Sequence, residues 1–224
     1  MGIESPVLYN YYFKGLRNYV HGTTMFESFC RVLRDNNIDI FEIKDLKFHK
    51  ELHHNGQIIL KRQLTEDEDA PQGLLVASMS FLVDGEIAYI NLLDDPDSEV
   101  IDRRDDLTGT FIKEVHQTGI YESQGRIVNV KDFESFVTAL IEVNKRTHIQ
   151  TLDDTNKAYS YRWVFLRTLC VDFSLEFPKE VVVKIKHLGL KKGKDGKNYT
   201  LNTLNFFLQE KAYKLMISFA YSKR

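Results

Sequence analysis

The chain has 224 residues, of which 43% are hydrophobic and 28% are charged, a composition typical of a folded protein. Its 30 basic and 32 acidic residues leave a net charge of −2, which disfavours proteins that bind nucleic acid through bulk charge. The apolar stretches fall well short of the ~18 residues that suggest a membrane span, and the N-terminal sequence lacks the pattern of a secretory signal. Two cysteines, Cys30 and Cys170, cannot form a disulfide framework or a zinc site by themselves. We therefore expect a cytoplasmic protein without a metal or other cofactor, which binds neither nucleic acid nor membranes.

The first half of the chain combines one helix with several strands. Thr24 and Glu27 have the spacing of a capping box. Apolar residues then recur at helical intervals until Asn36, where the helix is expected to end. Two strands should meet at Asp84-Gly85, a dipeptide favoured in tight hairpin turns. The strand-like segments are 8–20, 39–48, 56–63, 74–83 and 86–93, and the acidic stretch 65–73 is expected to be an exposed loop.

The second half repeats this order. MFESFCRVL at 25–33 resembles DFESFVTAL at 132–140, where the second helix is expected to span 132–144. Two further matches occur in the same order, FHKEL with FPKEV and SFLVDGEIAY with FFLQEKAY, which indicates an internal duplication. The acidic stretch between the copies predicts a first unit at 1–95, a linker at 96–108 and a second unit at 109–224. The β-like segments of the second unit are 111–121, 161–177, 180–186, 200–208 and 212–221.

One helix followed by antiparallel strands is an α+β unit, and a helix that is apolar around much of its circumference should be wrapped by a curved sheet. A buried helix with an early carboxylate, followed by DLKFHKEL, GQIILKRQ and LLVASMSFLVDGEIAYI, resembles the hotdog fold and is most similar to the 3-hydroxyacyl-carrier-protein dehydratases. The resemblance covers nearly the whole chain. It implies a double hotdog, with two antiparallel sheets each wrapped around a long central helix and the two units packed as a pseudo-dimer. Hotdogs include dehydratases, thioesterases and acyl-binding modules, so the fold alone does not select a function.

The resemblance also identifies candidate site residues. In the dehydratases a glycine opens the central helix and a carboxylate follows five residues later, and Gly22 and Glu27 have this spacing. In the second unit these places are taken by Asn129 and Glu134. A backbone N–H at the helix N-terminus would polarise the thioester carbonyl, which places Gly22 and the adjacent Thr23 in the substrate-binding site. The carboxylates would act on a proton or a water molecule.

The dehydratase pattern that places a catalytic histidine ahead of this helix is absent, and the nearest substitute is His21. The run Val-His-Gly-Thr also resembles the His-Gly-Gly of the small acyl-CoA thioesterase hotdogs. An imidazole with an ordinary pKa of ~6.5 suits a general base at neutral pH. Because hotdog active sites lie between two units, the resemblance implies either that His21 and Gly22 face Glu134 or that Glu27 faces groups of the second unit.

Each candidate also has a structural explanation. Glu27 could serve only the capping box, and His21 could be a hydrogen-bonded loop histidine. Glu134 lies between Phe133 and Phe136, where a carboxylate is costly to bury unless it is paired, so a structural role explains it less well.

Cysteines and histidines elsewhere in the chain offer little chemistry. The two cysteines are expected to be small core residues. His49, His53 and His54 lie at a strand end without the spacing of a metal site.

The resulting hypothesis is an enzyme of fatty acid or polyketide biosynthesis that acts on acyl thioesters of acyl-carrier protein or coenzyme A. In a 3-hydroxyacyl-thioester dehydratase, His21 would remove the α-proton and Glu134 would protonate the leaving hydroxyl. In a thioesterase, one carboxylate would activate water against the same carbonyl. A non-catalytic acyl-binding or scaffold protein is the third interpretation. The six lysines from Lys184 to Lys197 could receive an acidic carrier protein, and exposed sheet edges could support a homodimer.

Overall fold

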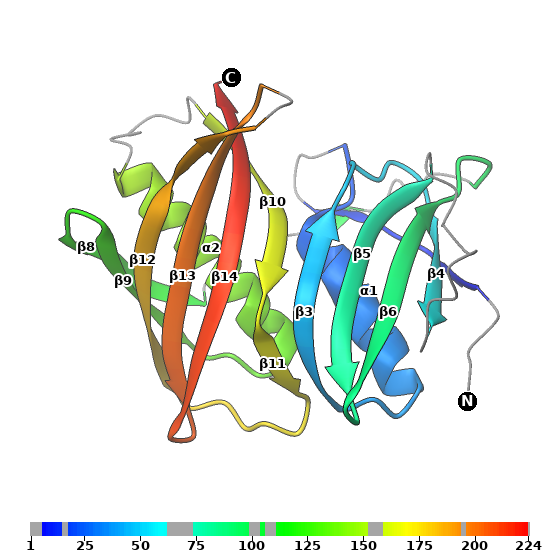
Figure 1. Ribbon diagram of the computed structural model, residues 1–224, viewed down its shortest axis with the longest axis horizontal. Coiled ribbons are helices and arrows are strands. Elements are labelled where there is room, and N and C mark those ends of the chain that lie inside the picture. Colours follow the sequence, from blue (N-terminus) through cyan, green and yellow to red (C-terminus); the bar gives the residue numbers. More distant parts are fainter. Residues whose placement is uncertain are drawn as a thin grey trace. The chain divides into compact units, whose positions relative to one another are not determined.

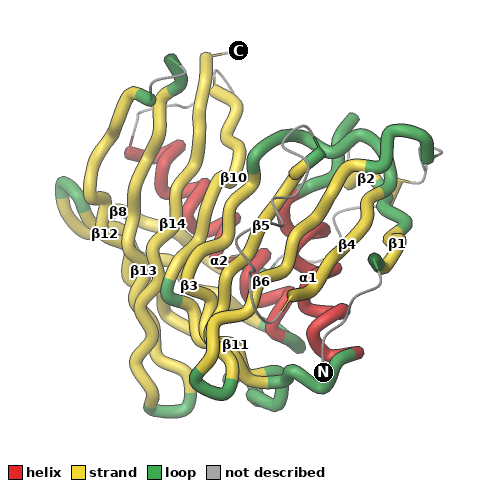
Figure 2. The backbone as a smooth tube through the Cα atoms, turned by 45° about the vertical axis from the view of Figure 1, so that its right-hand side comes forward, coloured by secondary structure: helices red, strands yellow, loops and turns green. Residues whose placement is uncertain are grey.

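The computed structural model describes residues 6–14, 18–61, 74–98, 104–105, 111–151, 159–193 and 196–223. The chain divides into two compact units, Met1–Gly109 and Thr110–Arg224. Within the described residues, each unit is a mostly antiparallel sheet with one α-helix against one of its faces (Figures 1 and 2). Most of the predicted linker, 96–108, and all of the predicted loop, 65–73, lie outside these residues.

Unit 1 contains a sheet with the strand order β1-β4-β6-β5-β3, in which every pair is antiparallel. Two further short strands, β2 and β7, pair in parallel. The elements are β1 (Val7–Tyr9), β2 (Phe13–Lys14), α1 (Gly22–Asp35), β3 (Ile40–Phe48), β4 (Gly56–Lys61), β5 (Leu75–Val83), β6 (Glu86–Asp94) and β7 (Arg104–Asp105). The predicted strands are therefore confirmed, except that the segment 8–20 forms only two short ones.

Helix α1 buries nearly one whole side against the sheet of unit 1. Its apolar residues on that side are at most 4% exposed, and each such side chain contributes roughly 1.5–3 kcal/mol by burial. They are Met25, Phe26, Phe29, Cys30, Val32 and Leu33. The helix ends as predicted, because Asn36 caps its C-terminus and Asn37 adopts a left-handed conformation with φ 57°.

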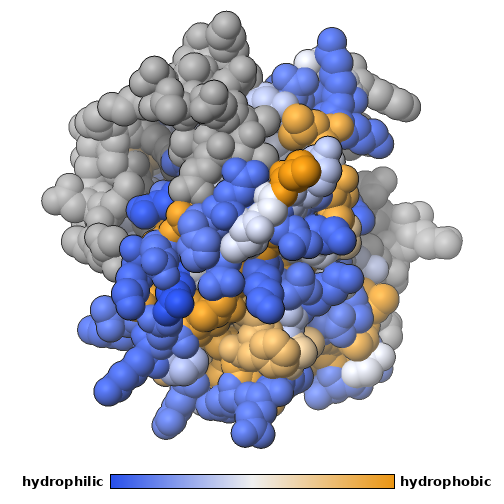
Figure 3. Space-filling model, turned by 90° about the vertical axis from the view of Figure 1, so that its left-hand side faces the viewer, coloured by the Kyte–Doolittle hydropathy of each residue, from blue (hydrophilic) through white to orange (hydrophobic). Residues whose placement is uncertain are grey.

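Unit 2 contains a sheet with the strand order β8-β9-β12-β13-β14-β10, again antiparallel throughout. Its elements are β8 (Ile112–Gly119), β9 (Glu122–Val128), α2 (Phe133–Thr151), β10 (Tyr159–Arg167), β11 (Leu169–Asp172), β12 (Glu180–Lys192), β13 (Asn198–Leu208) and β14 (Lys211–Lys223). On the side shown in Figure 3, hydrophobic side chains reach the surface between hydrophilic ones.

Helix α2 is longer than predicted, because it continues from Asn144 to Thr151. In the sequence, Asn144 followed by two basic residues resembles a helix end. In the structure Asn144 is fully buried and its Oδ1 accepts a hydrogen bond of 2.6 Å from Asn202 Nδ2 on β13. A contact with a residue 58 positions later therefore determines where this helix continues.

Strand β9 was missed by the sequence prediction, which took 111–121 as a single β-like segment. The chain instead turns at residues 120–121, so that Gly119 pairs with Glu122. The inward-facing residues of β9 include Ser123 and Gly125, which lack the large apolar side chains that indicate a strand. Gly125 is required there because a Cβ would lie 2.5 Å from Val143 Cγ1 of α2.

The two units agree in the order of their elements but not in the order of their strands. The β5–β6 and β13–β14 hairpins, which the sequence matches equate, both turn through two residues of positive φ. In unit 1 the strand after the helix, β3, pairs with the first strand of the hairpin. In unit 2 the corresponding strand, β10, pairs with the second strand, β14. The repeat therefore predicts the elements but not every pairing.

No helix within the described part of the chain is long and apolar enough to cross a membrane.

The contact between β9 and α2 predicts a specific stability defect. Gly125→Ala should lower the free energy of unfolding by about 1–3 kcal/mol, because Val143 is β-branched and has little freedom to move away. Urea unfolding followed by circular dichroism measures this change. The double variant Gly125→Ala/Val143→Ala should lose less stability than the sum of the two single variants. Additive losses would contradict the contact.

Candidate functional site

The N-terminus of α1 is organised by His21, which is its N-cap residue and adopts an extended conformation. The His21 carbonyl oxygen accepts hydrogen bonds from the N–H groups of Thr24, at 2.9 Å, and Met25, at 3.1 Å. The His21 Nδ1 atom accepts from the Thr23 N–H at 3.4 Å and lies 2.8 Å from Thr23 Oγ1. One residue therefore satisfies three N–H groups of the first helical turn.

Gly22 is the first residue of α1, and no hydrogen bond to its N–H is found among the described residues. This amide lies at the positive end of the helix dipole, where a carbonyl oxygen or an anion binds favourably. The sequence prediction that Gly22 opens the helix is confirmed. The Thr23 N–H is used within the cap, and its role in substrate binding stays a prediction.

The cap also defines the proton position on His21. A ring nitrogen that accepts a hydrogen bond carries no proton, so the neutral ring has its proton on Nε2. In this arrangement Nε2 is a donor. To act as a general base through Nε2, the ring would have to release the Thr23 N–H.

The predicted capping box is wrong, because the helix begins two residues before Thr24. Thr24 lies inside the first turn, is 2% exposed, and its hydroxyl has no hydrogen-bond partner among the described residues. Capping therefore does not account for Glu27, which is a half-buried residue in the second turn of α1. The structural explanation offered for Glu27 by the sequence is removed.

Helix α2 begins differently from α1. Asp132 caps it, since its Oδ1 accepts from the Ser135 N–H at 2.8 Å and its carbonyl oxygen accepts from the Phe136 N–H at 3.1 Å. Asn129 does not open the helix as Gly22 opens α1. It precedes the cap by three residues, has φ 58°, and donates its N–H to the Lys179 carbonyl oxygen at 3.4 Å.

Glu134 lies in the first turn of α2 and is 8% exposed. Phe133, which precedes it, and Phe136, two residues after it, belong to an aromatic cluster. Phe136 packs against Phe177 at a ring-centroid distance of 5.0 Å and against Phe206 at 5.1 Å, and Phe133 lies 6.3 Å from Phe136. Glu134 is thus a buried carboxyl group at a helix N-terminus beside an apolar cluster.

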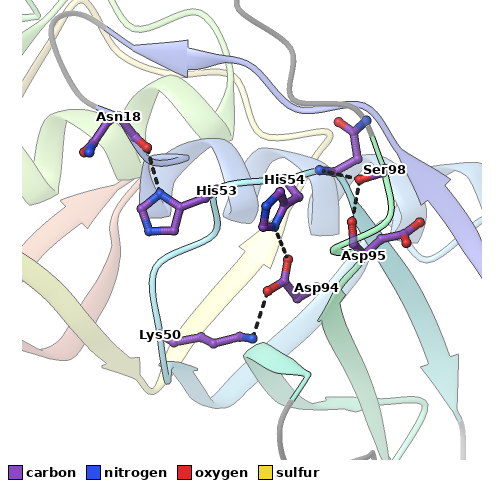
Figure 4. A network of polar contacts seen from close by, with 8 residues as sticks. Asn18, Lys50, His53, His54, Asp94, Asp95 and Ser98 are labelled. Carbon is purple, nitrogen blue, oxygen red and sulfur yellow. Dashed lines mark hydrogen bonds and ion pairs between the residues drawn. The ribbon is translucent and has the colours of Figure 1, made fainter.

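The three histidines at 49–54 contact separate partners in unit 1, and Figure 4 shows those of His53 and His54. His54 Nδ1 lies 3.2 Å from Asp94 Oδ1, whose other oxygen accepts from Lys50 Nζ at 2.9 Å. His53 Nδ1 donates to the Asn18 carbonyl oxygen, and His49 Nε2 contacts Ser78 Oγ at 2.8 Å. Among the described residues, no group of three or more His, Cys, Asp or Glu side chains could hold a metal ion.

Of the two cysteines expected in the core, only Cys30 lies there. Cys30 is buried in the core of unit 1, whereas Cys170 is half-buried. Lys184, Lys186, Lys191, Lys192 and Lys197 are exposed, and β12 extends to Lys192 before the chain turns.

Sequence reasoning missed a buried polar cluster in unit 2, formed by Ser123, Asn144, His148, His187 and Asn202. Asn202 Nδ2 donates to Asn144 Oδ1 at 2.6 Å and to His148 Nε2 at 2.8 Å. His187 Nδ1 donates to Asn202 Oδ1 at 3.1 Å, and His187 Nε2 lies 3.3 Å from Ser123 Oγ. These residues are scattered over α2, β9, β12 and β13, so no local motif indicates them.

The bonding pattern of the cluster requires both histidines to be neutral. His148 accepts at Nε2, and His187 accepts at Nε2 from the Ser123 hydroxyl. Burial, together with the nearby His187, lowers the pKa of His148 to about 3, and burial also lowers the pKa of His187. The centroids of the His148 and His187 rings are 5.5 Å apart.

The cluster predicts a loss of stability in acid. The pKa of His148 is about 6.5 in the unfolded chain and about 3 in the folded one, so protons bind preferentially to the unfolded state. The free energy of unfolding should fall as the pH drops through 6.5, by roughly 2–4 kcal/mol between pH 7 and pH 4. Urea unfolding at both pH values measures this. His148→Gln, which keeps an acceptor for Asn202, should reduce the pH dependence, and an unchanged slope would contradict the assignment.

No family model matches the sequence, and no curated protein matches it either. Among solved structures, a pyran synthase domain from module nine of the sorangicin pathway is 7% identical, with a TM-score of 0.50 and coverage of 98% of this chain and 92% of the other. The tesB protein of Mycobacterium avium subs paratuberculosis is 6% identical, with a TM-score of 0.50 and coverage of 98% and 93%. A conserved protein of unknown function with a hot dog fold, from Alicyclobacillus acidocaldarius, is 8% identical, with a TM-score of 0.50 and coverage of 92% and 88%. The likeness is one of fold, and it confirms the hotdog resemblance inferred from the sequence.

Proposed function

We propose that the protein acts on acyl thioesters of coenzyme A or acyl-carrier protein, with the thioester carbonyl bound at the N-terminus of α1. The observation that carries this proposal is the Gly22 N–H, which no hydrogen bond satisfies among the described residues while His21 satisfies the next three. An amide so placed can donate to an oxygen that gains negative charge in the transition state. The hotdog fold and the sequence resemblance to dehydratases and thioesterases support the same substrate class.

Hydrolysis is the reaction that the geometry supports best. It requires one polarised carbonyl and one base for water, and α1 carries both a donor and the half-buried carboxylate of Glu27. Glu27 would take a proton from water as the oxygen attacks the carbonyl carbon. The tetrahedral oxyanion would accept hydrogen bonds from Gly22 N–H and His21 Nε2–H. Cleavage of the C–S bond would then release the acid and a thiol, which recovers the proton.

Dehydration of a 3-hydroxyacyl thioester is the second candidate, and the observation that favours it is the burial of Glu134. A carboxyl group at 8% exposure near the start of α2 could protonate a leaving hydroxyl. This reaction also needs a base for the α-proton. His21 could supply one only after its Nδ1 releases Thr23, and for this reason dehydration ranks second.

The double hotdog belongs to this proposal. In that arrangement each unit is one hotdog, with its antiparallel sheet wrapped around its own helix. The exposed lysines of β12 would receive an acidic carrier protein through charge complementarity. A protein that only binds acyl groups would share the Gly22 contact but would turn over no substrate.

Replacement of Gly22 by proline tests the central contact. Proline removes the N–H but is well tolerated at the first position of a helix, and the extended His21 before it suits a proline neighbour. Thermal stability should therefore hold, while kcat for thioester hydrolysis falls by about 10²–10³-fold. The readout is free thiol released from acyl-coenzyme A. Gly22→Ala, which keeps the N–H, is the matched control, and equal activity in the two variants would refute the role of this amide.

A substrate panel with two carboxylate variants separates the reactions. Saturated and 3-hydroxyacyl thioesters, each on coenzyme A and on acyl-carrier protein, are incubated with the protein and followed by mass. Release of free acid indicates hydrolysis and loss of one water indicates dehydration. Glu27→Gln should reduce hydrolysis by about 10²–10⁴-fold, whereas Glu134→Gln should affect dehydration alone. Acyl binding without turnover would contradict both reactions and support the non-catalytic interpretation.

A further inference from the structure

The polar cluster of unit 2 contains three side chains in the order nucleophile, base and orienting group. Ser123 Oγ lies 3.3 Å from His187 Nε2, and His187 Nδ1 lies 3.1 Å from Asn202 Oδ1. A carboxamide oxygen can only accept, so His187 carries its proton on Nδ1 and presents an unprotonated Nε2 to the serine. These are the atoms through which a histidine activates a serine in acyl-transfer enzymes.

The orienting group is itself held in place. Asn202 is 1% exposed, and its Nδ2 donates both to Asn144 Oδ1 and to His148 Nε2. Rotation of this amide would break both bonds, so its oxygen remains directed at His187. The lowered pKa values of both histidines keep the network in this neutral form near pH 7.

One buried donor in the cluster is left over. Asn144 is fully buried, and its Nδ2 has no hydrogen-bond partner among the described residues. A buried N–H without a partner is costly, which points to an acceptor that binds there. A carbonyl oxygen that develops charge during attack by Ser123 is such an acceptor.

A second serine–histidine pair in the chain provides an internal comparison. In unit 1, Ser78 Oγ lies 2.8 Å from His49 Nε2, but no third side chain is found on His49 Nδ1 among the described residues. This pair is exposed. Unit 2 differs from unit 1 in having the orienting group, not in having the pair.

The surroundings of the cluster indicate the kind of substrate. The His187 N–H donates to the Tyr121 carbonyl oxygen at 2.8 Å, which joins β12 to the turn between β8 and β9. Large apolar side chains are exposed on these two segments. Their exposed fractions are 78% for Ile120, 66% for Tyr121, 47% for Leu188 and 59% for Leu190. An apolar acyl chain suits such a surface.

We propose that Ser123, His187 and Asn202 form a second acyl-transfer site, at which Ser123 accepts the acyl group of an activated ester or thioester. Ser123 Oγ forms a bond to the carbonyl carbon while its proton passes to His187 Nε2. The bond to the alcohol or thiol then breaks, and His187 returns the proton to that leaving group. Water attacks the acyl-serine by the same route and releases the acid. Ser123 and His187 are catalytic residues here, and Asn202 is a positioning residue.

The test is covalent labelling of the full-length protein with diisopropyl fluorophosphate. A small reagent is chosen because Ser123 is only 2% exposed. We expect one adduct, located on Ser123 by peptide mass spectrometry, and no adduct in Ser123→Ala or Ser123→Cys. Ser123→Cys is included because it preserves the size of the buried side chain and so guards against a folding defect. His187→Gln should slow labelling by about 100-fold or more. Asn202→Ala should also slow it, and Asn202→Asp, which keeps the acceptor oxygen, should restore most of the rate.

Matched controls separate this site from ordinary serines and from the site on α1. Ser218→Ala removes a serine that is also only 2% exposed, and Ser78→Ala removes the serine of the exposed pair. Both variants should be labelled at the normal rate. Gly22→Pro should also label normally, so failure of the α1 proposal leaves this result intact. Absence of an adduct, or an adduct that persists in Ser123→Ala, would overturn the proposal.

Discussion

Burial of a helix against each antiparallel sheet is the constraint on which the rest of this structure depends. A polar group on the sheet-facing side of such a helix loses its water and must find a protein partner. In unit 1 the Tyr11 hydroxyl lies 2.7 Å from Ser28 Oγ, which donates in turn to the Met25 carbonyl oxygen. In unit 2 the buried Asn144 bonds Asn202 across the core. Both helices therefore carry polar residues whose partners come from elsewhere in the fold.

The same constraint applies to the helix ends, and the two units meet it in different ways. Asp132 caps α2 with its carboxylate, in the manner common to many helices. His21 caps α1 with a ring nitrogen and a carbonyl oxygen, and it leaves Gly22 as the amide that can still bind an oxygen. A carboxylate cap would place negative charge where a thioester oxygen must become negative. A neutral imidazole avoids this repulsion and adds an N–H donor, so the unusual cap agrees with the proposed chemistry.

Much of the fold could be predicted from the sequence, because alternating apolar residues and the turn at Asp84-Gly85 depend on local preferences. What could not be predicted depends on contacts between distant residues. Thr24 is a better cap than histidine by general preference, yet the contact of His21 with Thr23 decides the start of α1. Asn144 resembles a helix end until Asn202 is placed opposite it. The β13–β14 hairpin turns through Gln209 and Glu210, which lack the glycine that marks such turns.

The candidate sites also differ in whether a local pattern or a contact between distant residues reveals them. Gly22 and Glu27 were identified from the resemblance to the dehydratases, whose glycine and carboxylate lie five residues apart in one helix, so the match depends on a local pattern. Ser123, His187 and Asn202 come from three strands, and each is a common polar residue in its own segment. Their chemistry exists only after β9 pairs with β12 and β12 with β13. Because β9 itself depends on Gly125 fitting beneath Val143, the packing of α2 is what brings the serine to the histidine. In unit 2 the buried helix thus determines both the core and the chemistry that the core can hold.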